Sequence, residues 1–130
     1  MPVSSIAIIG AGIAGLSAAT RLAAQGHAVT IFEKARGPGG RLASRRTSEG
    51  PIDIGAQYFT ARDPRFQSAL EQWRAAGVVA TWGERLLSLG KSASDESQWQ
   101  RLRDDSTRYV ASPRMSALSR HLSEQLPAHA

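Results

Sequence analysis

The sequence predicts an α/β fold in which two parallel strands are joined by a helix. Residues 6–9 and 28–32 are short β-branched runs with the composition of buried parallel strands. Between them, residues 14–25 are rich in Ala and Leu and carry apolar residues on one face, which predicts a helix that Gly26 closes. The three elements span about thirty residues, the length of one βαβ unit, whose crossover is almost always right-handed.

The middle of the chain is expected to leave this unit through a loop. Residues 36–48 are rich in Gly, Arg and Ser and predict a loop, and residues 51–55 predict a short extended segment. Asp63 followed by Pro64 predicts a helix N-terminus, because Asp caps the first N–H groups and Pro fits the first helical position. Apolar residues follow at helical spacing, and Gly77 is expected to end this helix.

The last third of the chain is expected to contain strands and one more helix. Residues 78–89 are expected to be extended, and residues 99–103 and 108–111 to form two strands joined by a turn at 104–106. Ser-Pro at residues 112–113 is expected to open the final helix, since Pro is favoured in a first helical turn. The apolar face of that helix is expected to contain Met115, Leu118, Leu122 and Leu126. Three tryptophans are expected to pack in a core or a domain interface: Trp73, Trp82 and Trp99.

The composition excludes several kinds of site. Apolar residues make up 42% and charged residues 21% of the 130 residues, which is ordinary for one globular domain. Without cysteine, a disulfide, a thiolate metal site, an iron–sulfur cluster and a cysteine nucleophile are all excluded. The three histidines show no metal-binding spacing. The longest apolar run is too short to cross a bilayer, so we expect a cytoplasmic protein without a membrane partner.

The net charge of +5 comes mainly from arginine. Only two of the 16 basic residues are lysines, so the other 14 are arginines. A basic surface can indicate nucleic-acid binding, but the cations form no run of five and acids are interleaved, so we expect no nucleic-acid partner. Because arginine favours bidentate phosphate contacts, a dinucleotide phosphate is a competing explanation. The densest basic stretch contains Lys34, Arg36, Arg41, Arg45 and Arg46.

A G-x-G-x-x-G motif follows the first predicted strand and opens the first predicted helix. Gly10 permits the sharp turn, Gly12 lets a pyrophosphate approach the backbone, and Gly15 lets helix and strand pack closely. The free N–H groups around Ile13 and Ala14 lie at the positive end of the helix dipole and are expected to face the phosphates. This context predicts a dinucleotide-binding Rossmann-like domain.

Glu33 lies at the end of the second strand, where an acidic residue accepts hydrogen bonds from the ribose hydroxyls of an adenosine. Its charge opposes a 2′-phosphate, because two unit charges about 4 Å apart repel by roughly 4 kcal/mol at an effective dielectric constant near 20. The position therefore favours FAD or NAD over NADP.

Two further segments separate FAD from NAD. Gly39-Gly40-Arg41 can bring backbone and a cation to a pyrophosphate, although a flexible loop with a solvated Arg41 explains the triplet equally well. In Asp53-Ile54-Gly55-Ala56-Gln57-Tyr58, an amide and an aromatic ring follow small residues, which suits a turn beneath a flavin. From chemistry alone, a strand with buried Tyr58 and Phe59 is the better explanation of that segment.

Taken together, the motifs resemble the N-terminal part of the amine-oxidase-type FAD-dependent oxidoreductases, and more narrowly the renalase-like proteins. The first three motifs occur in many flavoenzymes, and the narrower resemblance depends on D-x-G-A-Q-Y and on the later P-x-M-S. The matching residues are 8–15, Glu33-Lys34, Gly39-Gly40-Arg41, 53–58, Tyr109-Val110 and 112–116.

The resemblance implies a flavoprotein oxidase that oxidises dihydro isomers of NAD(P)H. In such enzymes a hydride passes to flavin N5, and O2 then reoxidises the flavin and yields hydrogen peroxide. No catalytic acid or base is implied, and no metal. The implied FAD-binding residues are Gly10, Gly12, Ile13, Ala14, Gly15, Glu33, Lys34, Gly40, Arg41, Ala56, Gln57 and Tyr58.

The resemblance also implies a domain division. Residues 1–62 are expected to form the FAD-binding βαβ core, residues 63–107 a helix and extended segments on the substrate-domain side, and residues 108–130 a return segment with a helix. Members of the family are much longer, so we expect this chain to be the first part of a larger protein. A non-catalytic FAD- or NAD-binding fragment and an amine-oxidase-type enzyme with another substrate remain alternatives.

Overall fold

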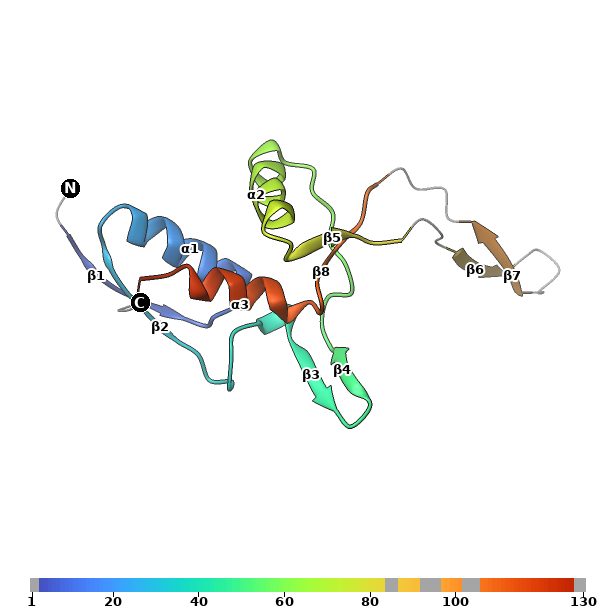
Figure 1. The fold of residues 1–130 in the computed structure, drawn as a ribbon, viewed down its shortest axis with the longest axis horizontal. Helices are drawn as coiled ribbons and strands as arrows, with labels where there is room; N and C mark the ends of the chain where they lie inside the picture. The colour runs from blue at the N-terminus through green and yellow to red at the C-terminus, as the bar shows by residue number, and fades with distance from the viewer. Residues whose placement is uncertain (1–2, 84–86, 92–96, 102–105, 128–130) are drawn as a thin grey trace.

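The computed structural model describes every residue except 1–2, 84–86, 92–96, 102–105 and 128–130 (Figure 1). Its strands are β1 (Ser5–Ile9), β2 (Ala28–Phe32), β3 (Ser44–Thr47), β4 (Gly50–Asp53), β5 (Val79–Thr81), β6 (Leu87–Lys91), β7 (Ser97–Arg101) and β8 (Tyr109–Ala111). Its helices are α1 (Ile13–Ala24), α2 (Pro64–Ala75) and α3 (Ser116–Glu124), with a short 3-10 turn at Gly40–Leu42. Within these described ranges, no helix has the length and apolarity needed to cross a membrane.

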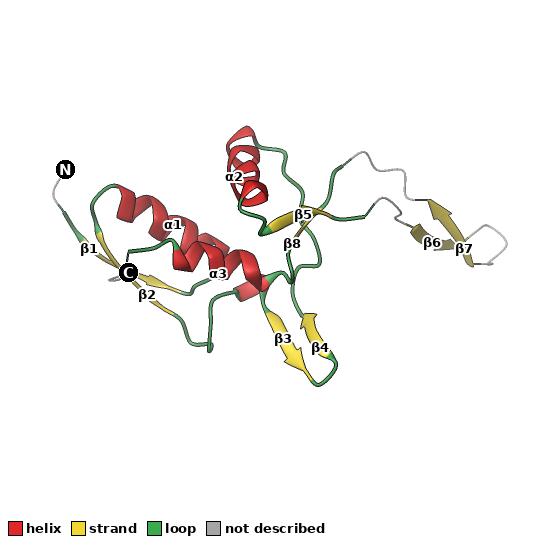
Figure 2. Ribbon diagram, in the orientation of Figure 1, coloured by secondary structure: helices red, strands yellow, loops and turns green. Residues whose placement is uncertain are grey.

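The N-terminal βαβ unit is confirmed. β1 and β2 pair in parallel, from Ser5 opposite Ala28 to Ile9 opposite Phe32, and α1 connects them (Figure 2). Behind the last turn of α1, the His27 N–H donates to the Leu22 carbonyl at 3.1 Å, so the helix ends where the sequence predicted.

The prediction that both strands are buried is wrong for one face of the sheet. Side chains alternate along each strand, so that Val29 is buried while Ile9 is 82% exposed and Phe32 is 56% exposed. The reason is that this sheet has only two strands among the described residues, and α1 packs against one face of it. A fully buried parallel strand needs cover on both faces.

The loop predicted over residues 36–48 is interrupted by a strand. β3 pairs antiparallel with β4, with Thr47 opposite Gly50 and Ser44 opposite Asp53. β4 confirms part of the predicted extended segment at residues 51–55. The sequence did not predict β3 because Arg45 and Arg46 are exposed and the strand has no buried apolar face that would give a period of two.

α2 begins and ends as predicted. The Asp63 side chain accepts a hydrogen bond from the Arg65 N–H at 2.8 Å, and Pro64 occupies the first helical position. The helix ends at Ala75, just before Gly77, which has a positive φ. Its inner face joins an aromatic cluster in which the ring centroids of Phe66 and Trp73 lie 5.7 Å apart, edge to face.

The strands after α2 form, but they pair differently from the prediction. β7 and β8 are not partners: β5 pairs with β8, and β6 pairs with β7, both antiparallel. β6 extends past the predicted end at residue 89, and its Gly90 pairs with Gln98. Part of the predicted turn at 104–106 lies outside the described residues. Pairing between non-adjacent strands depends on contacts that local turn patterns do not encode.

α3 starts at Ser116, later than the predicted opening at residues 112–113. Its predicted apolar face is confirmed for Leu118 and Leu122, which are buried on the helix. Met115 is buried directly before α3, and Leu126 lies after the helix and is half-buried. α3 packs against α1, and the two helices lie side by side over the parallel strands (Figure 1). The largest cluster of buried apolar residues therefore joins the βαβ unit to the end of the chain.

Of the three tryptophans, Trp73 alone is buried in the core. Trp73 is 8% exposed, whereas Trp82 is 38% exposed and Trp99 is 68% exposed. Trp99 lies on β7, which with β6 forms a separate two-stranded sheet without a second layer among the described residues. An isolated hairpin has no core in which to bury a large ring.

We expect Leu118→Ala to lower the free energy of unfolding by about 2–5 kcal/mol, because it empties a fully packed site between α1 and α3. Ile52→Ala on β4 is the matched control: Ile52 is 55% exposed, so its effect should stay within about 0.5 kcal/mol. Urea titration of both variants measures the difference, and equal effects would show that α3 does not stabilise the fold.

Candidate nucleotide-binding site

The two glycine loops of the sequence meet in space. The Gly39 N–H donates to the Ala11 carbonyl at 3.0 Å, and Gly39 forms an isolated parallel bridge with Gly12. A Cβ at Gly40 would lie 3.2 Å from the Gly12 Cα, and Gly40 has φ +53°, in the left-handed region. Only glycine satisfies both conditions without strain. The second loop is therefore packed on the first, and the explanation of Gly39–Arg41 as a free surface loop is wrong for its backbone.

The first loop turns sharply and opens α1. Gly10 has φ +98°, and its N–H donates to the Phe32 carbonyl at 2.8 Å, which fixes the loop to the end of β2. A Cβ at Gly15 would collide with the Gly10 carbonyl oxygen, as the close packing of helix and strand predicts. No side chain caps the helix at Gly12, and its first turn contains no acid. The first N–H groups, including those of Ile13 and Ala14, thus have no intrahelical acceptor and suit an anion.

Glu33 connects the loop to the chain after β2. Its Oε2 accepts a hydrogen bond from the Ala11 N–H at 2.8 Å, and its Oε1 accepts one from the Ala35 N–H at 2.7 Å. The bond from Ala35, and then the bond from Ala11, hold the pKa of Glu33 below its ordinary value. The carboxylate is therefore ionised at neutral pH, and it retains lone pairs for further donors such as ribose hydroxyls.

The third motif packs on the second. The Ala56 N–H donates to the Arg41 carbonyl at 2.8 Å, and a Cβ at Gly55 would collide with that same oxygen. The backbone of Arg41 is thus held on both sides, by Gly12 through Gly40 and by the Gly55–Ala56 pair. Its side chain remains exposed, as are those of Lys34 and Gln57.

Tyr58 is not the buried strand residue that chemistry alone favoured. It is 41% exposed, and its ring stacks on Trp82 with centroids 5.4 Å apart. The Arg108 guanidinium carbon lies 5.0 Å from the centroid of the Tyr58 ring, in cation–π contact. Phe59, in contrast, is half-buried and bridges to Tyr109. The predicted turn therefore presents one aromatic ring outward and packs the next one inward.

Two motifs far apart in the sequence also make direct contact. Asp53 Oδ1 accepts a hydrogen bond from the Met115 N–H at 3.0 Å and one from the Ser44 hydroxyl at 2.6 Å. The Ser44 oxygen in turn accepts a bond from the Ser116 N–H at 3.1 Å. D-x-G-A-Q-Y and P-x-M-S thus meet at the N-terminus of α3, where two side chains satisfy its first N–H groups.

A cavity of about 700 Å³ lies beside Glu33 and the first loop. It is large enough for a nucleoside-sized ligand. It is lined by Ala11, Leu16, Ile31 and Glu33, by residues 35–38 after β2, and by Ser123, Glu124, Leu126 and Pro127 near the end of α3. The adenosine end of a dinucleotide suits this cavity, because it combines apolar side chains with the ionised carboxylate of Glu33 next to the first glycine loop. In the described residues, no cluster of three or more His, Asp or Glu side chains could hold a metal ion.

Several residues of the site were missed by sequence reasoning. Ala11 contributes only backbone groups, and Ser44 and Asp53 act across more than sixty residues. The position of Asp53 next to the predicted turn was the one available indication. Trp82 and Arg108 became part of the site through the pairing of β5 with β8, which the sequence did not reveal.

A profile of the family described as "NAD(P)-binding Rossmann-like domain" matches residues 8–73, the segment that carries the glycine loops and Glu33. The chain belongs to this family. The observed site agrees with that membership, since Gly10, Gly12, Gly15 and Glu33 occupy the positions that the fold uses for a dinucleotide.

The most similar curated relatives found include 4,4'-diapophytoene desaturases (4,4'-diaponeurosporene-forming) of staphylococci. The protein of Staphylococcus haemolyticus (strain JCSC1435) is 52% identical over 58 residues, which are 45% of this chain and 12% of the relative. The protein of Staphylococcus aureus (strain Newman) is 52% identical over 50 residues, 38% of this chain and 10% of the relative. The chain thus spans about an eighth or less of the length of these relatives.

Among solved structures, the chain is similar to wild-type putrescine oxidase bound to putrescine, with a TM-score of 0.57. The identity is 26%, and the match covers 80% of this chain and 23% of that protein. The predicted Rossmann-like fold class and the predicted FAD cofactor are confirmed by the family profile and these matches. The chain therefore carries a dinucleotide-binding Rossmann-like domain, and the solved structures that it resembles include an oxidase.

We expect Gly15→Ala to weaken FAD binding about tenfold or more, because the new Cβ displaces the Gly10 carbonyl and with it the loop. Gly90→Ala is the matched control, since a Cβ there meets no heavy atom within 4 Å. Flavin fluorescence titration measures both dissociation constants, and unchanged binding in Gly15→Ala would contradict the assignment of the loop.

The lowered pKa of Glu33 predicts a pH dependence. A carboxylate with a folded-state pKa below its unfolded-state pKa stabilises the fold fully above the unfolded-state value, and the stabilisation is lost as pH falls through the folded-state value. We expect Glu33→Gln to lower the melting temperature at neutral pH and to flatten its fall in acid. Glu71→Gln, on the exposed face of α2, should leave the profile unchanged. Parallel profiles for wild type and Glu33→Gln would disprove the role of the two backbone hydrogen bonds.

Proposed function

We propose that this chain is the FAD-binding part of a renalase-like flavoprotein oxidase that oxidises dihydro isomers of NAD(P)H. The observation that carries the proposal is the convergence of four separate motifs on one site. Gly39 contacts Ala11, Glu33 holds the same loop, and Ala56 is bound to the Arg41 carbonyl. Such an arrangement suits a ligand that extends from an adenosine to a second planar ring.

The narrower assignment depends on two motifs. D-x-G-A-Q-Y and P-x-M-S are the segments that resemble renalase-like proteins, and they touch through Asp53 and the Met115 N–H. This contact supports the interpretation that the two segments act together, because Asp53 binds the chain at the start of α3. The glycine loops lie within the segment that the Rossmann-like family profile matches, so they support the broader family and not the substrate.

Each part of the site has a proposed task. The N–H groups of Ile13 and Ala14 and the Arg41 guanidinium bind the pyrophosphate, and Glu33 binds the ribose. Gln57 and Tyr58 lie beside the flavin. When bound, FAD supplies the hydride acceptor and the subsequent transfer of electrons to O2. The chain itself positions the cofactor and supplies the charges that bind its phosphates and ribose, and no side chain of the site is assigned as an acid or base.

A second candidate function is a dinucleotide-binding module without turnover of its own. It is favoured by the small share of the relatives that this chain spans, 12% of the S. haemolyticus desaturase and 23% of putrescine oxidase. We further propose that the division at residues 62 and 107 separates the FAD-binding core from substrate-side segments, and that the protein works in the cytoplasm.

The test is reduction of bound FAD under anaerobic conditions. We expect dihydro isomers of NAD(P)H to bleach the flavin absorbance and air to restore it with one hydrogen peroxide per turnover, whereas putrescine and a polyene leave it unchanged. Bleaching by putrescine or by the polyene would contradict the proposed substrate and identify an amine or a polyene in its place. FAD binding without bleaching by any of the three would support the second candidate.

A variant test addresses the cofactor itself. We expect Arg41→Ala to weaken FAD binding about tenfold, because one charge-assisted contact to the pyrophosphate is lost. Arg62→Ala removes the same charge from an exposed residue next to α2 and should change the dissociation constant less than about twofold. A protein that stays colourless after incubation with FAD would refute the proposed function as a whole.

A further inference from the structure

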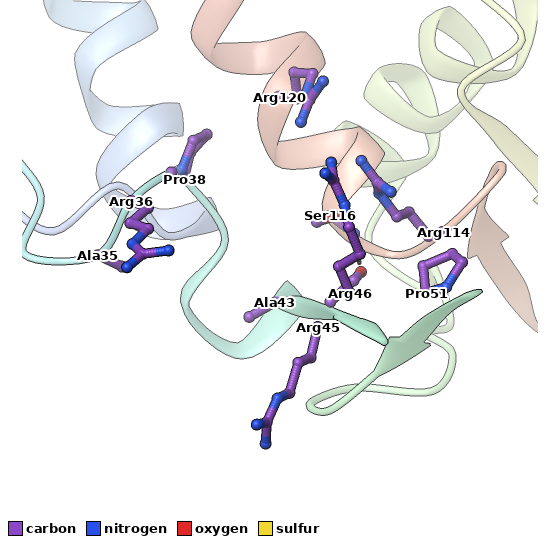
Figure 3. A pocket seen from close by; sticks show the side chains of 12 residues that line it. Ala35, Arg36, Pro38, Ala43, Arg45, Arg46, Pro51, Arg114, Ser116 and Arg120 are labelled. Atoms are coloured by element: carbon purple, nitrogen blue, oxygen red, sulfur yellow. Dashed lines mark hydrogen bonds between the residues drawn. The ribbon is translucent and has the colours of Figure 1, made fainter. Parts of the chain in front are cut away.

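A second cavity, of about 530 Å³, is lined by basic side chains (Figure 3). We call it the arginine pocket, and its basic residues are Arg36, Arg45, Arg46, Arg114 and Arg120. Ser44 and Ser116 also line it, and none of its lining residues is acidic. It shares residues 35–38 with the cavity beside Glu33, but neither Gly10–Gly15 nor Gly39–Arg41 lines it. It is therefore a separate cavity that adjoins the one beside Glu33.

The arginines come from segments that are distant in the sequence. Arg46 lies on β3, Arg114 precedes α3, and Arg120 lies on α3. In Figure 3, Arg46 extends toward the start of α3, where Arg114 lies, whereas Arg45 extends away from them. This agrees with the alternation of side chains along a strand. The hydrogen bond from the Ser116 N–H to Ser44 holds the start of α3 against β3 and so fixes the spacing of the pocket walls.

These charges are not compensated by acids of the pocket. The ion pairs found among the described residues involve Arg65 and Arg74, which lie elsewhere. Asp53, an acid on the same hairpin, uses Oδ1 to accept bonds from Ser44 and the Met115 N–H. The guanidinium groups of Arg46, Arg114 and Arg120 belong to residues that line one cavity, and the positive field they create there attracts anions. Arginine, in addition, matches phosphate oxygens in bidentate geometry.

We propose that the arginine pocket binds the phosphate groups of a small anionic ligand distinct from FAD. The inference rests on the proposed function in one respect, since it assigns those phosphates to the dinucleotide substrate. The cavity volume lies within the range of small-molecule sites, and its charge disfavours a cationic amine such as putrescine. The pocket thus favours an anionic substrate over a cationic one.

The test measures binding of inorganic pyrophosphate by isothermal titration calorimetry. We expect the double variant Arg114→Ala/Arg120→Ala to weaken pyrophosphate binding about tenfold or more, because two charge-assisted contacts are lost. Arg21→Ala/Arg62→Ala is the matched control: it removes the same net charge from two exposed residues outside the pocket and should change binding less than about twofold. Arg46→Ala, on the exposed hairpin, gives an independent variant that keeps α3 intact.

FAD titration of the same variants separates the two sites. We expect the dissociation constant for FAD to remain within about twofold in all of them. An equal loss of FAD binding in the pocket variants would assign these arginines to FAD and overturn the proposal, and so would equal losses of pyrophosphate binding in pocket and control variants. If the protein does not bind FAD but its pyrophosphate binding is lost in the pocket variants, the pocket is confirmed as a phosphate site and the proposed function is refuted. Tighter pocket-dependent binding of a DNA duplex than of pyrophosphate would overturn the small-ligand assignment.

Discussion

The close approach of Gly12 and Gly40 is the constraint on which the rest of the site depends. A Cβ on Gly40 would press on the backbone of Gly12, and the neighbouring Gly39 N–H is bonded to Ala11. Because the two loops touch without side chains between them, their backbone groups and the uncapped start of α1 face the same region. Arg41 follows directly, and its carbonyl fixes the turn that contains Gly55 and Ala56.

Glu33 and Asp53 have parallel structural roles at the two ends of this arrangement. Each carboxylate accepts a backbone N–H from a segment that is distant in the sequence, Ala11 in one case and Met115 in the other. Both bonds satisfy donors that the local secondary structure leaves without partners. The first shapes the loop at the end of β1, and the second sets where α3 begins. One side of the molecule is thereby built as a continuous surface that holds a nucleotide cavity and an arginine-lined cavity next to each other.

The two cavities differ in the charged side chains that line them. The cavity beside Glu33 is lined by apolar side chains and by the carboxylates of Glu33 and Glu124, which suits the ribose hydroxyls and the base of an adenosine. The arginine pocket offers guanidinium groups without an acid among its lining residues, which suits phosphate. The sequence-level observation that the basic residues are mostly arginine thus has a structural counterpart, since five arginines from the segment after β2, from β3 and from α3 with the residues before it line one cavity.

The sequence by itself determined the elements whose cause is local. The βαβ unit, the capped start of α2, the apolar face of α3 and the glycine positions of the first loop follow from β-branched runs, helical spacing and motifs within about forty residues. The tertiary structure alone decided the partners of β5 to β8, the exposure of Ile9 and Trp99, and the start of α3 at Ser116. These depend on which distant groups satisfy a hydrogen bond or cover a face, and such partners leave no periodic trace in the local sequence. The arginine pocket is likewise a product of the tertiary structure. Arg46 and Arg120 line one cavity because Ser44 and Asp53 hold the N-terminus of α3 against the β3–β4 hairpin.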